Sequence, residues 1–229
     1  VPGPGGLAEY VLLDDYQLYR ASNDVSFEEI CLSEPLACVI RSVRKSGVQR
    51  ADNAVVVGAG IMGMLHVTLL KQMGVRVIVS EIDGTRAAFA KKYGADDVIN
   101  PTDAPFADQV MQLTNGRGAD VVYCAVSVAA AVEQAVEAVA KGGRVHVYAS
   151  IHPKGSKISI DPNPFHNKEI VLTGTVSQTK EDVLEAVRMI SGRLVDLKPF
   201  ISLTLPFTRL EEALQRAMQP DTYRVIVTM

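Results

Sequence analysis

The chain has 229 residues, of which 48% are hydrophobic and 21% are charged, and its formal net charge is −3. This composition is that of an ordinary globular protein and excludes collagen, coiled coil and disorder. The slight negative charge argues against nucleic acid or an anionic membrane as a partner, because both repel such a chain. The longest apolar run, residues 121–132, stops at Glu133, short of the roughly 18 residues that a membrane helix needs.

The cysteines and the first residues bear on the compartment. Cys31, Cys38 and Cys124 form no CxxC pair, which is typical of a reduced protein. The sequence starts at Val1 without a basic-then-apolar leader pattern. We therefore expect a cytoplasmic location.

The first 50 residues predict a strand and a helix. Gly5 and Gly6 indicate a turn, and the apolar residues that follow predict a strand over 8–13. Apolar positions at three- and four-residue spacing predict a helix over 27–46, with Gly47 as its C-cap.

From residue 54, short β-branched runs alternate with amphipathic stretches. The expected strands are 55–57, 75–80, 98–99, 121–124 and 145–148, and the expected helices are 61–73, 86–93, 106–113 and 129–140. Apolar strands between helices are buried on both faces, which indicates a parallel sheet built from βαβ units. After a proline-marked loop the pattern predicts a strand at 169–173, a helix at 180–190, and strand, helix and strand at 200–205, 210–218 and 224–227. The predicted fold class is α/β, a doubly wound parallel sheet.

A GxGxxG motif directly follows the strand 55–57 and opens the next helix. Gly58 permits the tight turn, Gly60 lets a pyrophosphate approach the backbone, and Gly63 lets the helix pack on the strand. The helix N-terminus, at Ile61 and Met62, offers N–H groups and a positive dipole end to phosphates. The motif predicts a dinucleotide site in a Rossmann-type domain.

An acidic residue, Glu81, ends the next strand 23 residues after Gly58. This offset matches the acid that hydrogen-bonds the adenosine ribose hydroxyls. Because a carboxylate repels a 2′-phosphate, NAD is favoured over NADP, although the nearby Arg76 and Arg86 leave the choice open. A structural glycine turn with a solvated acid, and an S-adenosylmethionine methyltransferase, are the alternatives.

Further candidate residues follow later strands, because ligands of open α/β sheets bind at the carboxyl ends of strands. Val126 is expected to pack on the adenine or ribose, and Ala149 to lie near the nicotinamide. Cys124 and His66 are interpreted as structural residues.

Motifs in a fixed order run along the whole chain. They are Gly5–Val11, Ser33–Ala37, Gly58–Gly63, Glu81, Gly94–Asp96, Gly118–Val122, Gly142–Val145, His166–Gly174, Lys198–Ile201 and Glu211–Ala213. In order and spacing they resemble the zinc-dependent medium-chain dehydrogenases of the alcohol dehydrogenase superfamily, particularly the sorbitol/threonine dehydrogenase-like branch.

The resemblance implies an architecture and a chemistry. Residues 40–178 would form the NAD-binding Rossmann domain, and residues 1–39 and 179–229 would be parts of a β-rich GroES-like catalytic domain. The reaction would be hydride transfer between a polyol-like secondary alcohol, or the matching ketone, and NAD, with zinc on the substrate oxygen. Related proteins form homodimers or homotetramers.

The sequence departs from this family at the zinc site. The upstream Cys and the His-Glu pair that hold the catalytic zinc are absent, and the resemblance implies that they lie N-terminal of Val1. We therefore expect this chain to bind NAD without turning over substrate, and it offers no catalytic residue that can be identified. Glu34 matches the acid at the catalytic zinc, or simply starts a helix. Arg224 matches a basic residue at the cofactor phosphates, or is an ordinary strand arginine.

Two alternative functions stay open. One is a dinucleotide-binding fragment without catalysis, and the other is a zinc-free, quinone-reductase-like member of the same superfamily. The acid at Glu34 argues against the second, because zinc-free members do not need it.

Overall fold

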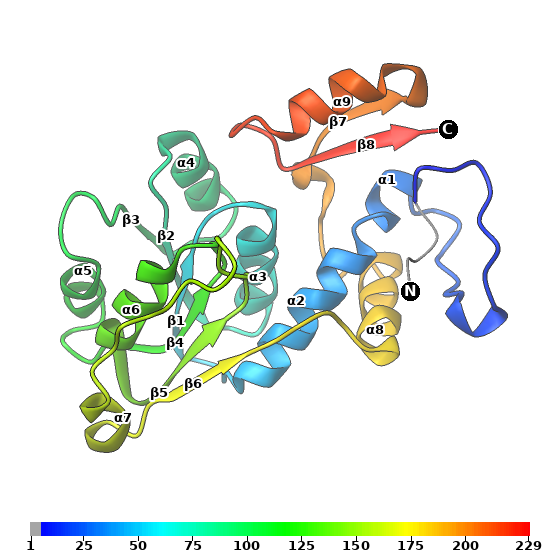
Figure 1. The fold of residues 1–229 in the computed structure, drawn as a ribbon. Helices are drawn as coiled ribbons and strands as arrows, with labels where there is room; N and C mark the ends of the chain where they lie inside the picture. Colours follow the sequence, from blue (N-terminus) through cyan, green and yellow to red (C-terminus); the bar gives the residue numbers. More distant parts are fainter. Residues whose placement is uncertain (1–5) are drawn as a thin grey trace. The chain divides into compact units, whose positions relative to one another are not determined.

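The computed structural model describes residues 6–229 of the chain. Contacts divide the chain into two compact units, Cys38–Gln178 and Val1–Ala37 together with Thr179–Met229. We call them the sheet unit and the split unit (Figure 1). Their limits lie within two residues of the domain limits expected at 40 and 178. The roles of these units as cofactor and catalytic domains stay predictions.

The sheet unit contains six parallel strands in the order β3-β2-β1-β4-β5-β6 (Figure 1). The strands are β1 (Asn53–Val57), β2 (Arg76–Ser80), β3 (Asp97–Ile99), β4 (Ala119–Cys124), β5 (Val139–Val147) and β6 (Val171–Gly174). This order, with its reversal between β1 and β4, is that of a Rossmann-type doubly wound sheet. The predicted α/β fold class is confirmed.

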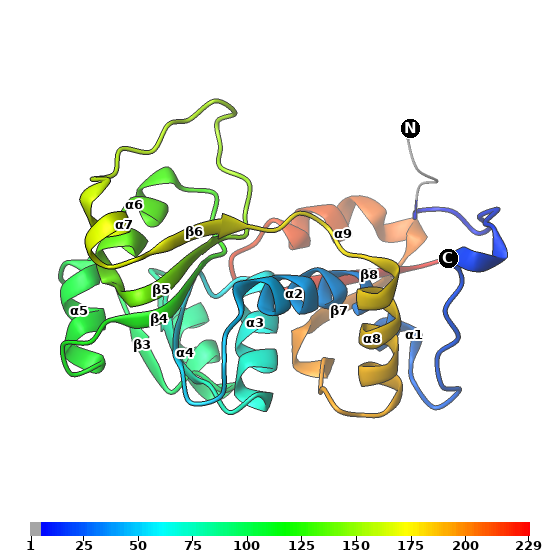
Figure 2. The ribbon, with the colours of Figure 1, turned by 90° about the horizontal axis from the view of Figure 1, so that it is seen from below.

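Helices cover both faces of this sheet, with α6 on one side and α3 on the other (Figure 2). Helix α2 (Ser33–Ser46) belongs to the split unit up to Ala37 and to the sheet unit from Cys38. The other helices of the sheet unit are α3 (Ile61–Gln72), α4 (Gly84–Lys92), α5 (Phe106–Leu113), α6 (Ala129–Ala138) and α7 (Asn163–Asn167). One face of the sheet carries Val55, Val122 and Val145 into an apolar core with α5 and α6. Side chains alternate along a strand, so Tyr123 and His146 lie on the other face.

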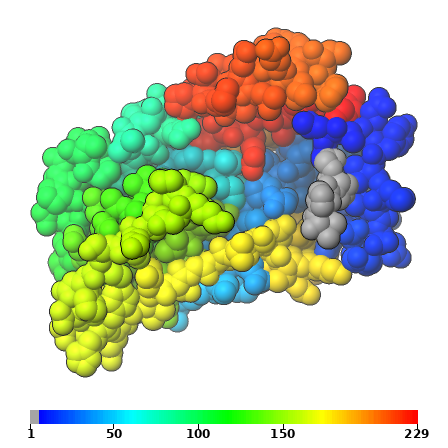
Figure 3. All heavy atoms as spheres, in the orientation of Figure 1, coloured from blue at the N-terminus to red at the C-terminus, as the bar shows by residue number. Residues whose placement is uncertain are grey.

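Strand β5 and the segment after it differ from the expected pattern. β5 begins at Val139, directly after α6, and not at residue 145 as expected. The sequence pattern missed the first half of β5 because the pair Gly142–Gly143 interrupts its apolar residues. Glu169 has a left-handed backbone with φ of 55°, so β6 begins two residues later than expected. The proline-rich segment between β5 and β6 contains the short helix α7, and residues 152–159 are exposed (Figure 3).

The split unit holds the end of the chain. Its elements are α1 (Phe27–Ile30), α8 (Lys180–Ser191), β7 (Ile201–Pro206), α9 (Leu210–Ala217) and β8 (Arg224–Thr228), with 3-10 turns at Asp15–Gln17, Lys198–Phe200 and Phe207–Arg209. β7 and β8 pair in parallel, as the predicted strand, helix and strand require. Within this unit Arg193 forms an ion pair of 2.7 Å with the buried Glu29.

Two predictions for the first 46 residues are wrong. Residues 8–13 form no strand; Tyr10 and Leu12 are 90% and 97% exposed. A strand needs a partner ladder and covered side chains, and the described residues provide neither. Gly5 of the expected turn lies outside the described residues. The helix 27–46 is broken into α1 and α2, because Pro35 has no N–H to bond the carbonyl of Cys31.

Among residues 6–229, no helix is both long and apolar enough to cross a membrane.

His66 of α3 lies fully buried beneath the sheet. Its Nδ1 bonds the Met62 carbonyl and its Nε2 bonds the Ser42 hydroxyl, each at 2.8 Å. Burial lowers the pKa of His66 to about 4, so the imidazole is neutral at pH 7. This agrees with its interpretation as a structural residue.

The stability of the protein is expected to fall as the pH drops from 6.5 to 4. An unfolded chain protonates His66 near its ordinary pKa, whereas the folded protein does so only near 4, so acid favours unfolding. The free energy of unfolding in urea should be about 2 kcal/mol lower at pH 5 than at pH 7 through His66 alone.

His146, whose pKa burial also lowers to about 4, adds to this slope. His66→Gln should therefore reduce the slope, and His152→Gln, at an exposed position, should leave it unchanged. Equal slopes in His66→Gln and the unsubstituted chain would contradict the assignment.

Candidate active-site cleft

The three glycines of the motif between β1 and α3 meet different surroundings. Gly58 has φ of 97°, and a Cβ there would lie 2.5 Å from Cγ1 of Val126. At Gly63 a Cβ would lie 1.9 Å from the Gly58 carbonyl oxygen. A Cβ at Gly60 would meet no atom within 4 Å. The protein itself thus requires the first and third glycines, and the second leaves an open space at the start of α3.

Glu81 joins the glycine turn to the end of β2. Its side chain is 8% exposed. Its Oε2 accepts the N–H of Ala59 at 2.7 Å, and its Oε1 accepts the N–H groups of Ile82 and Asp83 at 2.9 Å each. The sequence predicted an acid for a ribose, but not that both oxygens already bond the backbone. Each carboxylate oxygen has two lone pairs, so the group keeps capacity for a ligand hydroxyl.

Arg86 lies in the first turns of α4. The helix begins at the N-cap Asp83, whose side chain accepts the Arg86 N–H at 2.9 Å. An N-cap carboxylate satisfies N–H groups that a helix cannot pair internally. The cap therefore holds the Arg86 backbone beside the end of β2.

A cavity of about 510 Å³ opens at the carboxyl ends of β1, β2 and β4, and we call it the turn cavity. It brings together five predicted residues, which are Gly58, Gly60, Glu81, Arg86 and Val126. Pro101, Thr102 and Gln134 line it as well and were not predicted. The first two follow β3, so the rule that ligands bind at strand ends could have found them.

A second cavity, of about 600 Å³, lies at the carboxyl ends of β5 and β6, and we call it the β5–β6 cavity. Its lining residues are Cys38, Arg41, Lys45, Val147, Tyr148, Ala149, Ser150, Gly174, Thr175, Val176 and Ser177. Ala149 lies here as expected from its place after β5. The residues after β6 and those from α2 were missed, because the sequence does not reveal which helix packs beside these strand ends.

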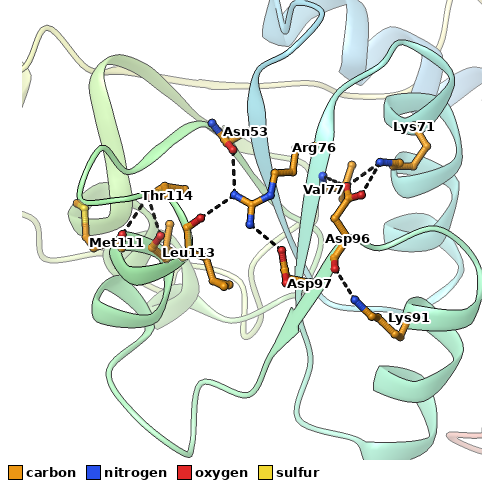
Figure 4. Close-up of polar contacts among 11 residues, drawn as sticks. Asn53, Lys71, Arg76, Val77, Lys91, Asp96, Asp97, Met111, Leu113 and Thr114 are labelled. Carbon is orange, nitrogen blue, oxygen red and sulfur yellow. Dashed lines mark hydrogen bonds and ion pairs between the residues drawn. The ribbon is translucent and has the colours of Figure 1, made fainter.

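The expectation that Arg76 lies near Glu81 is wrong. Arg76 starts β2, at the amino edge of the sheet, opposite to the glycine turn. Its guanidinium bonds Asp97 Oδ2 at 2.7 Å, the Leu113 carbonyl at 2.6 Å and Asn53 Oδ1 at 3.2 Å (Figure 4). Through these contacts Arg76 links β2 to β1, to β3 and to the end of α5.

A neighbouring ion pair also serves the sheet. Lys71 contacts Asp96 at 2.7 Å, and Asp96 accepts the Val77 N–H at 2.7 Å (Figure 4). Burial raises the pKa of Asp96, but Lys71 and the Val77 N–H outweigh it and hold this pKa below its usual value. The carboxylate is thus ionised and fixes the turn before β3.

The remaining candidates lie in the split unit. Glu34 is exposed in the first turn of α2, and Arg224 begins β8. Within residues 6–229 no group of three or more His, Cys, Asp and Glu side chains could hold a metal ion. The described residues thus do not fit a zinc site, and the roles of Glu34 and Arg224 stay predictions.

Residues 62–192, more than half of the chain, match the family described as zinc-binding dehydrogenase. The chain belongs to this family. It is 28% identical to D-arabitol-phosphate dehydrogenase of Enterococcus avium and 29% identical to L-threonine 3-dehydrogenase of Caldanaerobacter subterraneus subsp. tengcongensis. Each match covers 97% of this chain and 64% of the relative. The chain therefore spans less than two thirds of the length of these relatives.

A solved structure shares the fold of this zinc-binding dehydrogenase chain. It is a zinc-binding dehydrogenase of Sinorhizobium meliloti 1021 bound to NADP, with a TM-score of 0.86 and 21% identity. The match covers 92% of this chain and 62% of that chain. The resemblance to zinc-dependent medium-chain dehydrogenases that the motifs indicated is confirmed.

Proposed function

We propose that this chain binds NAD along the carboxyl edge of its sheet, as the cofactor-binding part of a zinc-type dehydrogenase. The complete enzyme would transfer hydride between a polyol-like secondary alcohol and the nicotinamide. The observation that carries the proposal is the glycine turn. The one glycine of its three that faces open space lies at the N-terminus of α3, next to the turn cavity and Glu81.

The residues of the sheet unit suggest a place for each part of NAD. The adenosine would enter the turn cavity against Val126, with Arg86 at its rim. One ribose hydroxyl would donate to the lone pair that Glu81 Oε2 still has free. The pyrophosphate would lie over Gly60, on the first N–H groups of α3 at Ile61 and Met62, which a helix leaves unpaired. The nicotinamide would then reach the β5–β6 cavity beside Ala149.

Several further statements belong to the complete protein. Arg224 would contact the cofactor phosphates, and Glu34 would lie at the zinc. Because the described residues do not fit a zinc site, we derive no step through the metal and expect no turnover from this chain. We also propose that the complete protein is cytoplasmic and forms a homodimer or a homotetramer. Two alternatives remain, which are a fragment that binds NAD without catalysis and a zinc-free reductase. An activity assay of the complete protein would distinguish them from the proposed function.

Calorimetric titration of the chain with NADH and with NADPH tests the cofactor. The buried Glu81 carboxylate repels a 2′-phosphate, so NADH should bind at least about tenfold more tightly. Gly60→Val should fold, since open space surrounds the position, and should lose NADH binding because its side chain takes the place of the pyrophosphate. No binding of NADH, or tighter binding of NADPH, would refute the proposal.

A further inference from the structure

Two buried histidines support the wall of the β5–β6 cavity. Thr175, the first residue after β6, bonds Nε2 of His146 through its Oγ1 at 2.8 Å. Tyr148, the first residue after β5, packs edge-on against the ring of His66 with a centroid distance of 4.7 Å. Both Thr175 and Tyr148 line the cavity. These two contacts hold Thr175 and Tyr148 in the wall of the cavity. The sequence alone shows only that each of the two residues follows the end of a strand.

His146 has an unusual position for an imidazole. It lies on β5 between β4 and β6, in register with Tyr123 of β4 and Thr173 of β6, and is fully buried. Its Nδ1 has no hydrogen-bond partner among the described residues. An apolar side chain would fill this place without the cost of desolvating an imidazole. The hydrogen bond to Thr175 is therefore the specific contribution of this histidine.

The missing partner of Nδ1 determines the direction of that bond. Burial lowers the pKa of His146 to about 4, so the ring is neutral at pH 7 and carries one N–H. A proton on Nδ1 would leave a buried N–H unpaired, which is rarer in proteins than an unpaired acceptor. The proton thus lies on Nε2 and is donated to Thr175. The threonine oxygen accepts, and its own O–H stays available as a donor.

We propose that His146 is a positioning residue for the β5–β6 cavity, which fixes Thr175 so that its hydroxyl donates to an acceptor on the bound ligand. Under the proposed function, on which this inference rests, that acceptor is the carboxamide oxygen of the nicotinamide. Thr175 is the residue that touches the ligand, and His146 acts through it. The turn cavity is not involved, because its lining includes neither residue.

Binding of two ligands by the full 229-residue chain tests this role. NADH contains the nicotinamide, and ADP-ribose contains the same adenosine, pyrophosphate and ribose without it. Thr175→Val and His146→Leu should each weaken NADH binding about five- to tenfold, the effect of one lost hydrogen bond, and leave ADP-ribose binding unchanged. Thr175→Ser and His146→Gln, which keep a hydroxyl and an N–H donor, should recover most of the NADH affinity.

The outcomes separate this inference from the proposed function. Unchanged NADH affinity in Thr175→Val overturns the inference alone, and so does an equal loss for both ligands, which would indicate a general effect on the sheet. Thr175→Val changes a partly exposed residue, so it gives the result even if His146→Leu fails to fold. A chain that binds neither NADH nor ADP-ribose refutes the proposed function, and this inference with it.

Discussion

Replacing Gly63 by alanine is expected to lower the free energy of unfolding by about 3 kcal/mol or more. The new Cβ would lie 1.9 Å from the Gly58 carbonyl oxygen and 3.0 Å from its carbon. Neither atom can move without shifting the turn, because both belong to the backbone. α3 would have to move away from β1, and this movement would also remove the open space beside Gly60. Urea unfolding followed by circular dichroism measures the effect, and NADH titration measures the loss of binding.

Gly60→Ala is the matched control for this substitution. The same methyl group enters the same motif three residues earlier, where no atom lies within 4 Å and φ is −69°. Its cost should stay within about 1 kcal/mol, the difference between glycine and alanine at an N-cap. NADH binding should still weaken, since the methyl group faces the place proposed for the pyrophosphate. Equal stability of the Gly63→Ala and Gly60→Ala proteins would contradict the packing described here.

Replacing Glu81 by alanine is expected to lower the free energy of unfolding by about 2–4 kcal/mol. The carboxylate accepts three backbone N–H groups, those of Ala59, Ile82 and Asp83. Removing it leaves these donors without their acceptor and releases the glycine turn from the end of β2. Under the proposed function NADH affinity should fall about tenfold or more, because the ribose loses its partner as well.

Glu137→Ala provides the comparison for loss of a glutamate without such bonds. Glu137 is exposed on α6, and its replacement should change stability by less than about 0.5 kcal/mol. A Glu81→Ala protein as stable as Glu137→Ala would refute the anchoring role. Unchanged NADH affinity in Glu81→Ala would refute the ribose role, whatever its stability.

Much of the fold could be predicted because its signals are local. The β-branched runs at 55–57 and 121–124 lie inside β1 and β4, and the helix 106–113 has the predicted bounds. The periods of apolar residues and the glycines that end helices depend on backbone geometry within a few residues. The GxGxxG motif is equally local. A Cβ would clash at its first and third glycines, and its second glycine faces open space.

Local signals failed where a partner was needed. Residues 8–13 have the composition of a strand, but a strand forms only in a ladder with another strand, and these residues form no such ladder within the described part of the chain. Arg76 was expected near Glu81 because the two residues are close in sequence. The length of β2 separates them, and a strand advances about 3.3 Å per residue, so they lie at opposite edges of the sheet.

The sequence by itself determined the α/β class, the parallel sheet, the family and the glycine turn with its acid. Only the tertiary structure decided what those residues touch. It showed that Glu81 bonds the glycine turn through Oε2 and the residues after β2 through Oε1, and that Thr175 meets His146 from 29 residues away. The physical reason is that periodicity reports the conformation of one segment. Hydrogen bonds between strands depend on register and on sheet order, which no single segment contains.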